Sequence, residues 1–154
     1  MAEPWASDWA AAHATTLTRS YRRWLGRDLL PEFVDPTTLA SALFEAPFVL
    51  VSHGTQADPV LNYGNRAALK LWEMSWEELT RTPSRLTAEP VAREERARLL
   101  AHVSEHGHIP NYAGVRISRT GRRFRIARAV VWNLLDEPGN HYGQAACFDQ
   151  WEFL

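Results

Sequence analysis

The sequence of 154 residues contains one cysteine, one lysine and no long apolar run. The single cysteine, Cys147, excludes an internal disulfide. Charges or prolines interrupt each apolar stretch well short of the ~20 residues that a membrane-spanning helix needs. The first ten residues also lack the basic segment and apolar core of a secretory signal. We therefore expect a cytoplasmic protein without membrane contacts.

The net charge is also small, at -1, because the chain has 17 basic and 18 acidic residues. No overall field therefore directs the protein to nucleic acid or anionic lipid. The basic residues are almost all arginine, and six of them crowd one segment: Arg116, Arg119, Arg122, Arg123, Arg125 and Arg128. Guanidinium groups suit phosphate, but no aromatic residues are interleaved with them as in a single-strand binder. Charge on an edge hairpin also prevents unwanted strand pairing. We do not expect nucleic-acid binding, whereas an anionic ligand or an acidic partner stays open.

Catalytic motifs are missing as well. No serine lies in a Gly-x-Ser-x-Gly turn, and no glycine-rich loop is present to hold a phosphate. Cys147 alternates with Ala145 and Trp151, which is typical of a small buried apolar residue rather than a nucleophile. The sequence thus does not predict an enzyme.

Hydrophobic residues make up 45% of the chain and include seven tryptophans, enough for a core. In the first half, residues 5–25 have the spacing of an amphipathic helix that ends at Gly26. A second helix begins near Asp35 and ends before Pro47. Two short apolar runs, 47–53 and 59–63, then predict a hairpin.

The second half begins with helices and ends with strands. A helix from Asn65 is followed by a capping box at Ser75, and a longer helix runs from Pro90 to Gly107. From residue 108 the period changes to two, with Val115 and Ile117 expected on the buried face. Three strands joined by hairpins complete an α+β domain with one five-stranded antiparallel sheet.

This order of elements is similar to the PAS sensory fold. The segment VLNYGNRAALKLWEMSWEEL resembles the PAS strand that enters an Asn-x-Ala-Ala helix and a Ser-x-Glu-Glu-Leu helix. Further segments resemble the MEKHLA family, a PAS-related domain found alone in bacteria and at the C-terminus of plant homeodomain leucine-zipper regulators: PSRLTAEP, YAGVRISRTGRRFRI, VVWNLLD and GQAACFDQW. Of these two forms, we expect the stand-alone bacterial type.

The resemblance implies a PAS-like sheet with helices inserted between strands two and three. Residues 1–45 would form a helical cap on a domain of residues 46–154. It further implies a sensing or interaction role without a known reaction. Flavin-binding light sensors carry a reactive cysteine on a helix, whereas Cys147 falls in the last predicted strand, so no flavin photoadduct is expected. Because the chain stops at Leu154, a signal would leave through a protein partner or a homodimer.

Arg128 is the most informative candidate for ligand binding. Strict alternation places it with Phe124 and Trp132, facing an apolar interior where an unpaired charge is costly. A bulge would instead turn it outward, and a structural ion pair is a further alternative. If it points inward, Arg128 would hold a carboxylate in a pocket between sheet and helices. The other candidate ligand-binding residues are Asn65, Trp72, Asn111, Phe124 and Trp132, each also compatible with a place in the core.

His102, His106 and His108 have spacings that suit zinc or a haem ligand. No cysteine is nearby, and histidines at a helix C-terminus also interact favourably with the exposed carbonyls. We therefore assign no metal or haem site.

Two functions remain. The first is a cytoplasmic sensor that binds a small apolar or aromatic ligand, with a carboxylate if Arg128 faces the pocket. The second is a ligand-free module that dimerises or docks a regulator. In that case Trp5, Trp9 and Tyr21 would form an exposed patch; if they cover the sheet, they belong to the core.

Overall fold

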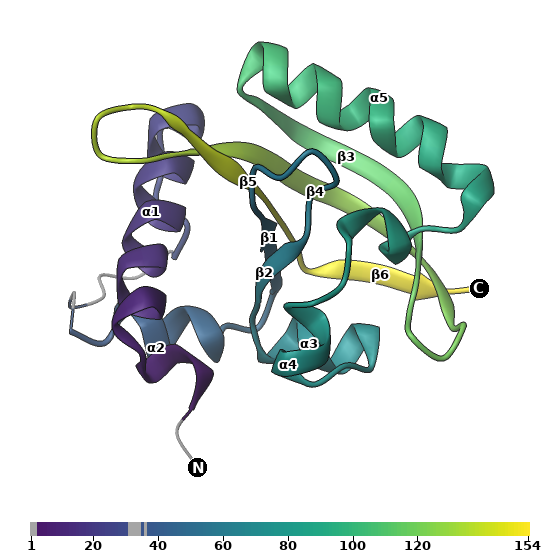
Figure 1. Ribbon diagram of the computed structural model, residues 1–154, viewed down its shortest axis with the longest axis horizontal. Helices are drawn as coiled ribbons and strands as arrows, with labels where there is room; N and C mark the ends of the chain where they lie inside the picture. The colour runs from purple at the N-terminus through teal and green to yellow at the C-terminus, as the bar shows by residue number, and fades with distance from the viewer. Residues whose placement is uncertain (1–2, 31–34, 36) are drawn as a thin grey trace.

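The structure, a computed structural model, describes residues 3–30, 35 and 37–154, with only the backbone described at 90–93 and 96. Each half of the chain begins with helices and ends with strands (Figure 1). The helices are η1 (Pro4–Ala6), α1 (Asp8–Leu25), α2 (Leu39–Phe44), α3 (Arg66–Trp72), α4 (Trp76–Leu79), η2 (Ser84–Thr87) and α5 (Pro90–His106). The strands are β1 (Val49–His53), β2 (Leu61–Gly64), β3 (His108–Ile117), β4 (Arg123–Leu135), β5 (His141–Phe148) and β6 (Gln150–Phe153).

The helix ends follow local capping rules. The Ser7 side chain accepts a hydrogen bond from the Ala10 amide at the start of α1, and Gly26 ends this helix in the left-handed conformation. At α4, Ser75 and Glu78 make both hydrogen bonds of the predicted capping box. Because these contacts are short in sequence, the end of α1 and the start of α4 could be predicted closely. Helix α1 instead begins at Asp8 rather than at residue 5, and α2 begins at Leu39 rather than near Asp35.

The sheet is antiparallel, with the strand order β2-β1-β5-β4-β3, and β6 pairs with β4. It has six strands among the described residues instead of the expected five. The difference arises at Asp149, where the predicted last strand bends. Its second part, β6, then pairs with the first half of β4, opposite Phe124 to Ala127.

A bulge at Arg128 divides β4. Arg128 has a φ of 55°, in the left-handed region, and one extra residue of β4 lies between the partners of Tyr112 and Gly114. An inserted residue reverses which face the following side chains occupy. Phe124 therefore lies on one face of the sheet, whereas Trp132 lies on the other. The expectation of strict alternation was wrong, and the bulge alternative is correct.

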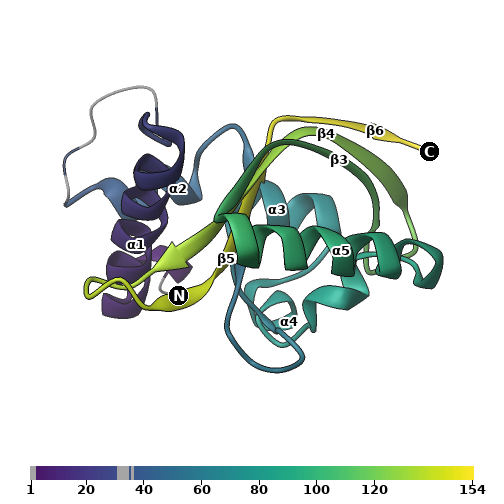
Figure 2. The same cartoon turned by 90° about the horizontal axis from the view of Figure 1, so that it is seen from above.

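The helices cover the two faces of the sheet (Figures 1 and 2). On one face, α1 and α2 enclose a core that contains Leu17, Leu43, Leu50, Trp132 and Leu134. On the other, α3 and α5 enclose two clusters that contain Val49, Trp72, Phe124, Leu99 and Val131. None of the described helices is long and apolar enough to cross a membrane.

Candidate functional site

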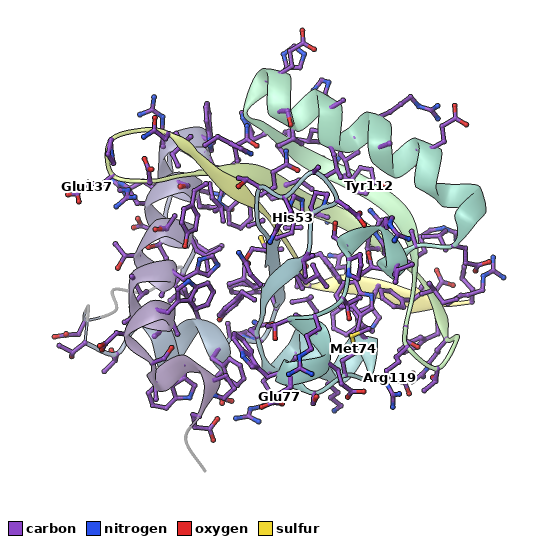
Figure 3. All side chains as sticks on the ribbon, viewed as in Figure 1. His53, Met74, Glu77, Tyr112, Arg119 and Glu137 are labelled. Carbon is purple, nitrogen blue, oxygen red and sulfur yellow. The ribbon has the colours of Figure 1, made fainter. Side chains whose placement is uncertain are left out.

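A cavity of about 80 Å³ lies between the sheet and helices α3 and α5. Its wall is largely apolar and includes Val51, Leu61, Trp72, Ile126, Ala129 and Phe148. Polar wall residues are Ser52, His53, Ser84, Thr87, Arg116 and Gln144. His53 on β1 and Tyr112 on β3, both labelled in Figure 3, also contribute to the wall. An apolar space with a few polar groups is the usual form of a small-molecule site.

Arg116 supplies positive charge to this cavity. Arg116 is only 8% exposed to solvent. The guanidinium donates to the Val115 carbonyl at 2.9 Å and to the Tyr112 hydroxyl at 3.4 Å, and it lies 5.5 Å from the centre of the Tyr112 ring. In the described part of the chain, no carboxylate pairs with it.

Sequence reasoning missed Arg116 because it assigned the inward face of β3 to Val115 and Ile117. These two side chains are instead partly exposed, and Arg116 and Ser118 are buried. Directly paired residues share a face of the sheet, and Arg116 pairs with the buried Phe124. A hairpin centred on Thr120 implies this pairing, so the signal was present in the predicted turn.

Two further wall residues carry polar atoms without partners. Trp72 is only 4% exposed, and its Nε1 has no hydrogen-bond acceptor among the described residues. Gln144 donates from Nε2 to Ser104 Oγ at 3.1 Å, but its Oε1 accepts from none of them. Buried polar atoms are nearly always paired with protein or water, so these atoms mark positions where a bound molecule can make hydrogen bonds.

Asn65 was predicted to bind ligand but is a structural junction. Its Oδ1 accepts from the Leu50 amide at 3.0 Å and the Ala68 amide at 3.1 Å. Its Nδ2 donates to the carbonyls of Phe48 at 2.8 Å and Leu43 at 3.2 Å. The amide has no remaining capacity for a ligand. Asn65 instead joins α2, β1 and α3.

The other residues predicted to bind ligand lie in different parts of the structure. Trp72 is part of the cavity wall, and Phe124 packs against its ring at 5.4 Å, behind that wall. Asn111 is exposed on β3. Arg128 is exposed because of its bulge, and Trp132 is buried beneath α1 on the opposite face. The predicted set therefore does not form one site, and the inward orientation of Arg128 was wrong.

The three residues predicted to form an interface also differ in their exposure to solvent. Tyr21 is buried and packs edge-on against Trp132, with ring centres 4.9 Å apart, so it belongs to the core. Trp9 remains 41% exposed and stacks on His13 at 4.5 Å. Trp5 is half-buried. Helix α1 thus covers the sheet, and an exposed patch of all three aromatic residues does not exist.

His13 links α1 to the sheet. Its Nε2 lies 2.8 Å from Ser52 Oγ, and this hydroxyl donates to Asn62 Oδ1 at 2.6 Å. Since the hydroxyl hydrogen is used for Asn62, the neutral imidazole donates from Nε2. Burial lowers the pKa of His13 to about 4. Because Ser52 also lines the cavity, this hydrogen bond connects the cavity wall to the helix on the opposite face.

The three histidines near the end of α5 do not converge. The exposed rings of His102 and His106 are 4.2 Å apart, whereas His108 stacks on Trp24 at 6.1 Å. Across the described ranges, no three His, Cys, Asp or Glu residues are placed to hold a metal ion.

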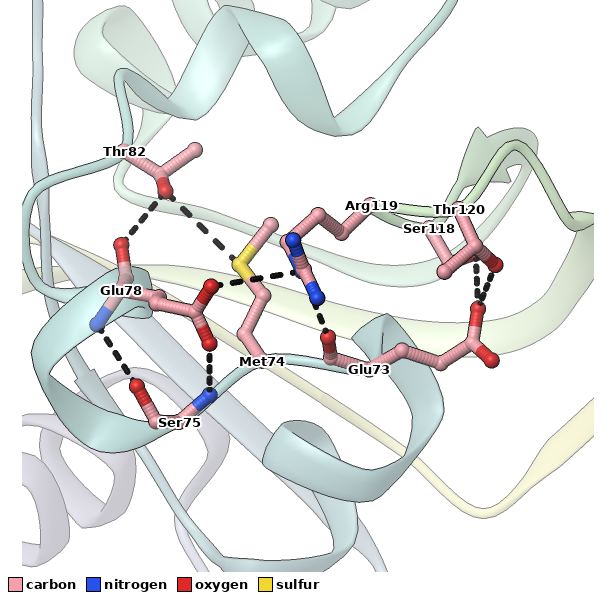
Figure 4. A network of polar contacts seen from close by, with 8 residues as sticks. All are labelled: Glu73, Met74, Ser75, Glu78, Thr82, Ser118, Arg119 and Thr120. Carbon is pink, nitrogen blue, oxygen red and sulfur yellow. Dashed lines mark hydrogen bonds and ion pairs between the residues drawn. The ribbon is translucent and has the colours of Figure 1, made fainter.

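A polar network fastens the turn between β3 and β4 to the α3–α4 segment (Figure 4). The Glu73 carboxylate accepts hydrogen bonds from Thr120 and Ser118, and these hydroxyls lower its pKa. Arg119 contacts the Glu73 carbonyl at 3.2 Å and the Glu78 carboxylate at 3.4 Å. This hairpin arginine is therefore held by the protein's own acceptors.

Two other hairpin arginines behave similarly. Arg123 pairs with Glu89 at 2.5 Å, and Arg122 lies 3.4 Å from the centre of the Phe153 ring. Both guanidinium groups are therefore held by contacts within the protein.

The fold resembles solved PAS structures. A PAS domain of a protein from Colwellia psychrerythraea superposes with a TM-score of 0.63 at 14% identity, over 77% of this chain and 95% of that chain. A light-oxygen-voltage domain, studied with a flavin analogue, superposes with a TM-score of 0.60 at 17% identity, over 76% of this chain and 84% of that chain. The PAS-like α+β fold expected from the sequence is thereby confirmed.

The cavity does not fit the flavin of light-oxygen-voltage domains. Its volume of about 80 Å³ is too small for a three-ring flavin, given that benzene alone occupies a cavity of about 150 Å³. Cys147 packs in the core beneath α1, on the opposite face of the sheet, and burial raises its pKa to about 12. The sheet therefore separates this thiol from the cavity.

The related sequences are plant proteins. The homeobox-leucine zipper protein HOX10 of Oryza sativa is 30% identical over 147 residues, and ATHB-9 of Arabidopsis thaliana is 25% identical over 143 residues. These matches cover 94% and 90% of this chain but only 17% of each relative. They lend no support to the expected stand-alone bacterial form. Residues 11–153 match the MEKHLA domain, and the chain therefore belongs to the MEKHLA domain family.

Proposed function

We propose that this chain is a PAS-like sensory domain that binds a small molecule between the sheet and helices α3 and α5. The observation that carries this proposal is the cavity itself, whose apolar wall includes the charged Arg116. Two more residues of this wall add polar atoms, Trp72 Nε1 and Gln144 Oε1, which have no hydrogen-bond partner among the described residues. Such groups fix the orientation of a ligand, and the apolar wall supplies most of its contact area.

The proposed signal leaves through the N-terminal helices. We treat residues 1–45 as a cap on the PAS-like body of residues 46–154. The hydrogen bond between Ser52 and His13 supports a route from the cavity wall to α1. A ligand that shifts β1 would change this contact and thereby the surface that α1 presents to a protein partner or a second copy. The cytoplasmic location remains a prediction.

A second candidate is a ligand-free interaction module. It is favoured by apolar side chains at the C-terminal end, where Trp151, Phe153 and Leu154 are 37%, 42% and 53% exposed. Exposed apolar groups on a short edge strand are typical of a docking surface. This candidate needs no molecule in the cavity.

Native mass spectrometry separates the two candidates. We expect the gently purified wild-type protein to carry an added small-molecule mass that denaturation releases. Ala129→Leu, which fills the cavity from a fully buried wall position, should lose that mass. Ala113→Leu, at an exposed position of β3, is the matched control and should keep it.

Two results would contradict the sensor proposal. One is a wild-type protein without added mass, which in dimeric form would support the interaction module. The other is an added mass that Ala129→Leu retains in full, because the molecule would then bind elsewhere.

A further inference from the structure

We propose that the cavity binds a short-chain aliphatic monocarboxylate, whose carboxylate pairs with the guanidinium of Arg116. This inference rests on the proposed function, since it assumes a ligand in the cavity, and it adds the chemical class of that ligand. Four features carry it: the buried charge, the geometry around the guanidinium, the size of the cavity and the composition of its wall.

The charge of Arg116 lacks a counter-ion. The residue is 92% buried, and no Asp or Glu of the described chain pairs with it. Taking a cation out of water without a partner is costly. The other hairpin arginines have such partners or lie at the surface, as with Arg119 and Arg123. An anion in the cavity would supply the missing charge.

The surroundings of Arg116 hold the guanidinium in place. The Val115 carbonyl and the Tyr112 hydroxyl each accept one hydrogen bond from it, and the Tyr112 ring lies alongside. Its other N–H groups have no acceptor among the described residues. A guanidinium with free, fixed N–H groups matches the two oxygens of a carboxylate. Trp72 Nε1 in the same wall also has no acceptor among the described residues. An acceptor atom on the ligand would satisfy this donor.

The volume limits the rest of the ligand. At about 80 Å³ the cavity offers roughly half the ~150 Å³ that accommodates benzene. An aromatic ring bearing a carboxylate therefore exceeds the space, whereas a short aliphatic chain fits. Val51, Ile126 and Ala129 offer that chain apolar contacts. The class of ligand is therefore narrower than the apolar or aromatic ligand expected from the sequence.

The wall also distinguishes one carboxylate from two. Arg116 is its single arginine or lysine among the described residues. A second carboxylate would enter an apolar space without a cationic partner, at a high desolvation cost. A monocarboxylate satisfies the charge of Arg116 and leaves its tail in the apolar part.

Sodium acetate, a monocarboxylate smaller than benzene, is the probe, and acetamide is its uncharged match. In isothermal titrations we expect wild type to bind acetate with an affinity at least about 10-fold higher than acetamide, since charged hydrogen bonds carry the difference. Arg116→Gln should lose about 10- to 100-fold in acetate affinity and no longer distinguish the two compounds. Arg128→Gln removes the same charge from an exposed position of β4 and should bind acetate like wild type.

The outcomes separate the two proposals. Equal binding of acetate and acetamide by wild type overturns the carboxylate inference, and this comparison needs no variant to fold. An equal loss in Arg128→Gln overturns it too, because the effect would then come from overall charge. A neutral molecule retained in native mass spectrometry overturns the carboxylate while the sensor proposal stands. If wild type carries no molecule and binds neither compound, both fail.

Discussion

Replacing Asn65 with alanine is expected to lower the free energy of unfolding by about 3 to 5 kcal/mol. The change removes the cap of α3, which costs about 1 kcal/mol. It also leaves the buried Leu50 amide and the Phe48 carbonyl without the partner that Asn65 provides, whereas the Leu43 carbonyl keeps its hydrogen bond from the Ala46 amide. Each unsatisfied buried group costs about 1 to 3 kcal/mol, partly offset where water reaches it.

Urea denaturation at neutral pH measures this loss. Asn111→Ala is the matched control, because Asn111 is exposed, and it should change the free energy of unfolding by less than about 0.5 kcal/mol. A loss of under about 1 kcal/mol in Asn65→Ala would mean that Asn65 does not join α2, β1 and α3 in the manner described.

Acidification is expected to destabilise the protein through His13. Its pKa is about 4 in the folded state, below the ordinary value of 6.5, because burial disfavours the imidazolium. Between these two values the unfolded chain binds a proton that the folded chain does not. The stability that His13 contributes is therefore complete above pH 6.5 and falls as the pH drops toward 4. The shift corresponds to a loss of about 3 kcal/mol.

The free energy of unfolding, measured between pH 4 and 7.5, tests this dependence. His13→Gln should remove the part of the slope that His13 causes, so that wild type and variant converge as the pH falls. His106→Gln changes an exposed histidine and should keep the wild-type slope. Parallel curves for wild type and His13→Gln would show that His13 does not titrate as its burial implies.

The fold was predictable where the signals are local. Gly26 and the capping box at Ser75 set helix ends through contacts over a few residues. The hairpin of β1 and β2 likewise followed from two apolar runs with a turn between them. These elements, in their order along the chain, were sufficient to identify the PAS-like α+β architecture.

The site was less predictable because it depends on strand register. The left-handed residue Arg128 shifts the side chains of β4 by one position. A single bulge thus moved Trp132 away from the cavity and turned Arg128 into solvent. Arg116 was missed for a related reason, since its face follows from pairing with Phe124 rather than from its neighbours along β3. Long-range pairing leaves no periodic mark that identifies a bulge.

The central claim is that the space between the sheet and helices α3 and α5 takes a small molecule. Mapping of amide chemical shifts with a set of fragments smaller than benzene tests it most directly. The account predicts that the fragments that bind shift the amides of Val51, Ile126 and Val131, which line the cavity, and that Ala129→Leu abolishes these shifts. Binding confined to the surface around Trp9 or Trp151, or shifts that persist in Ala129→Leu, would contradict it.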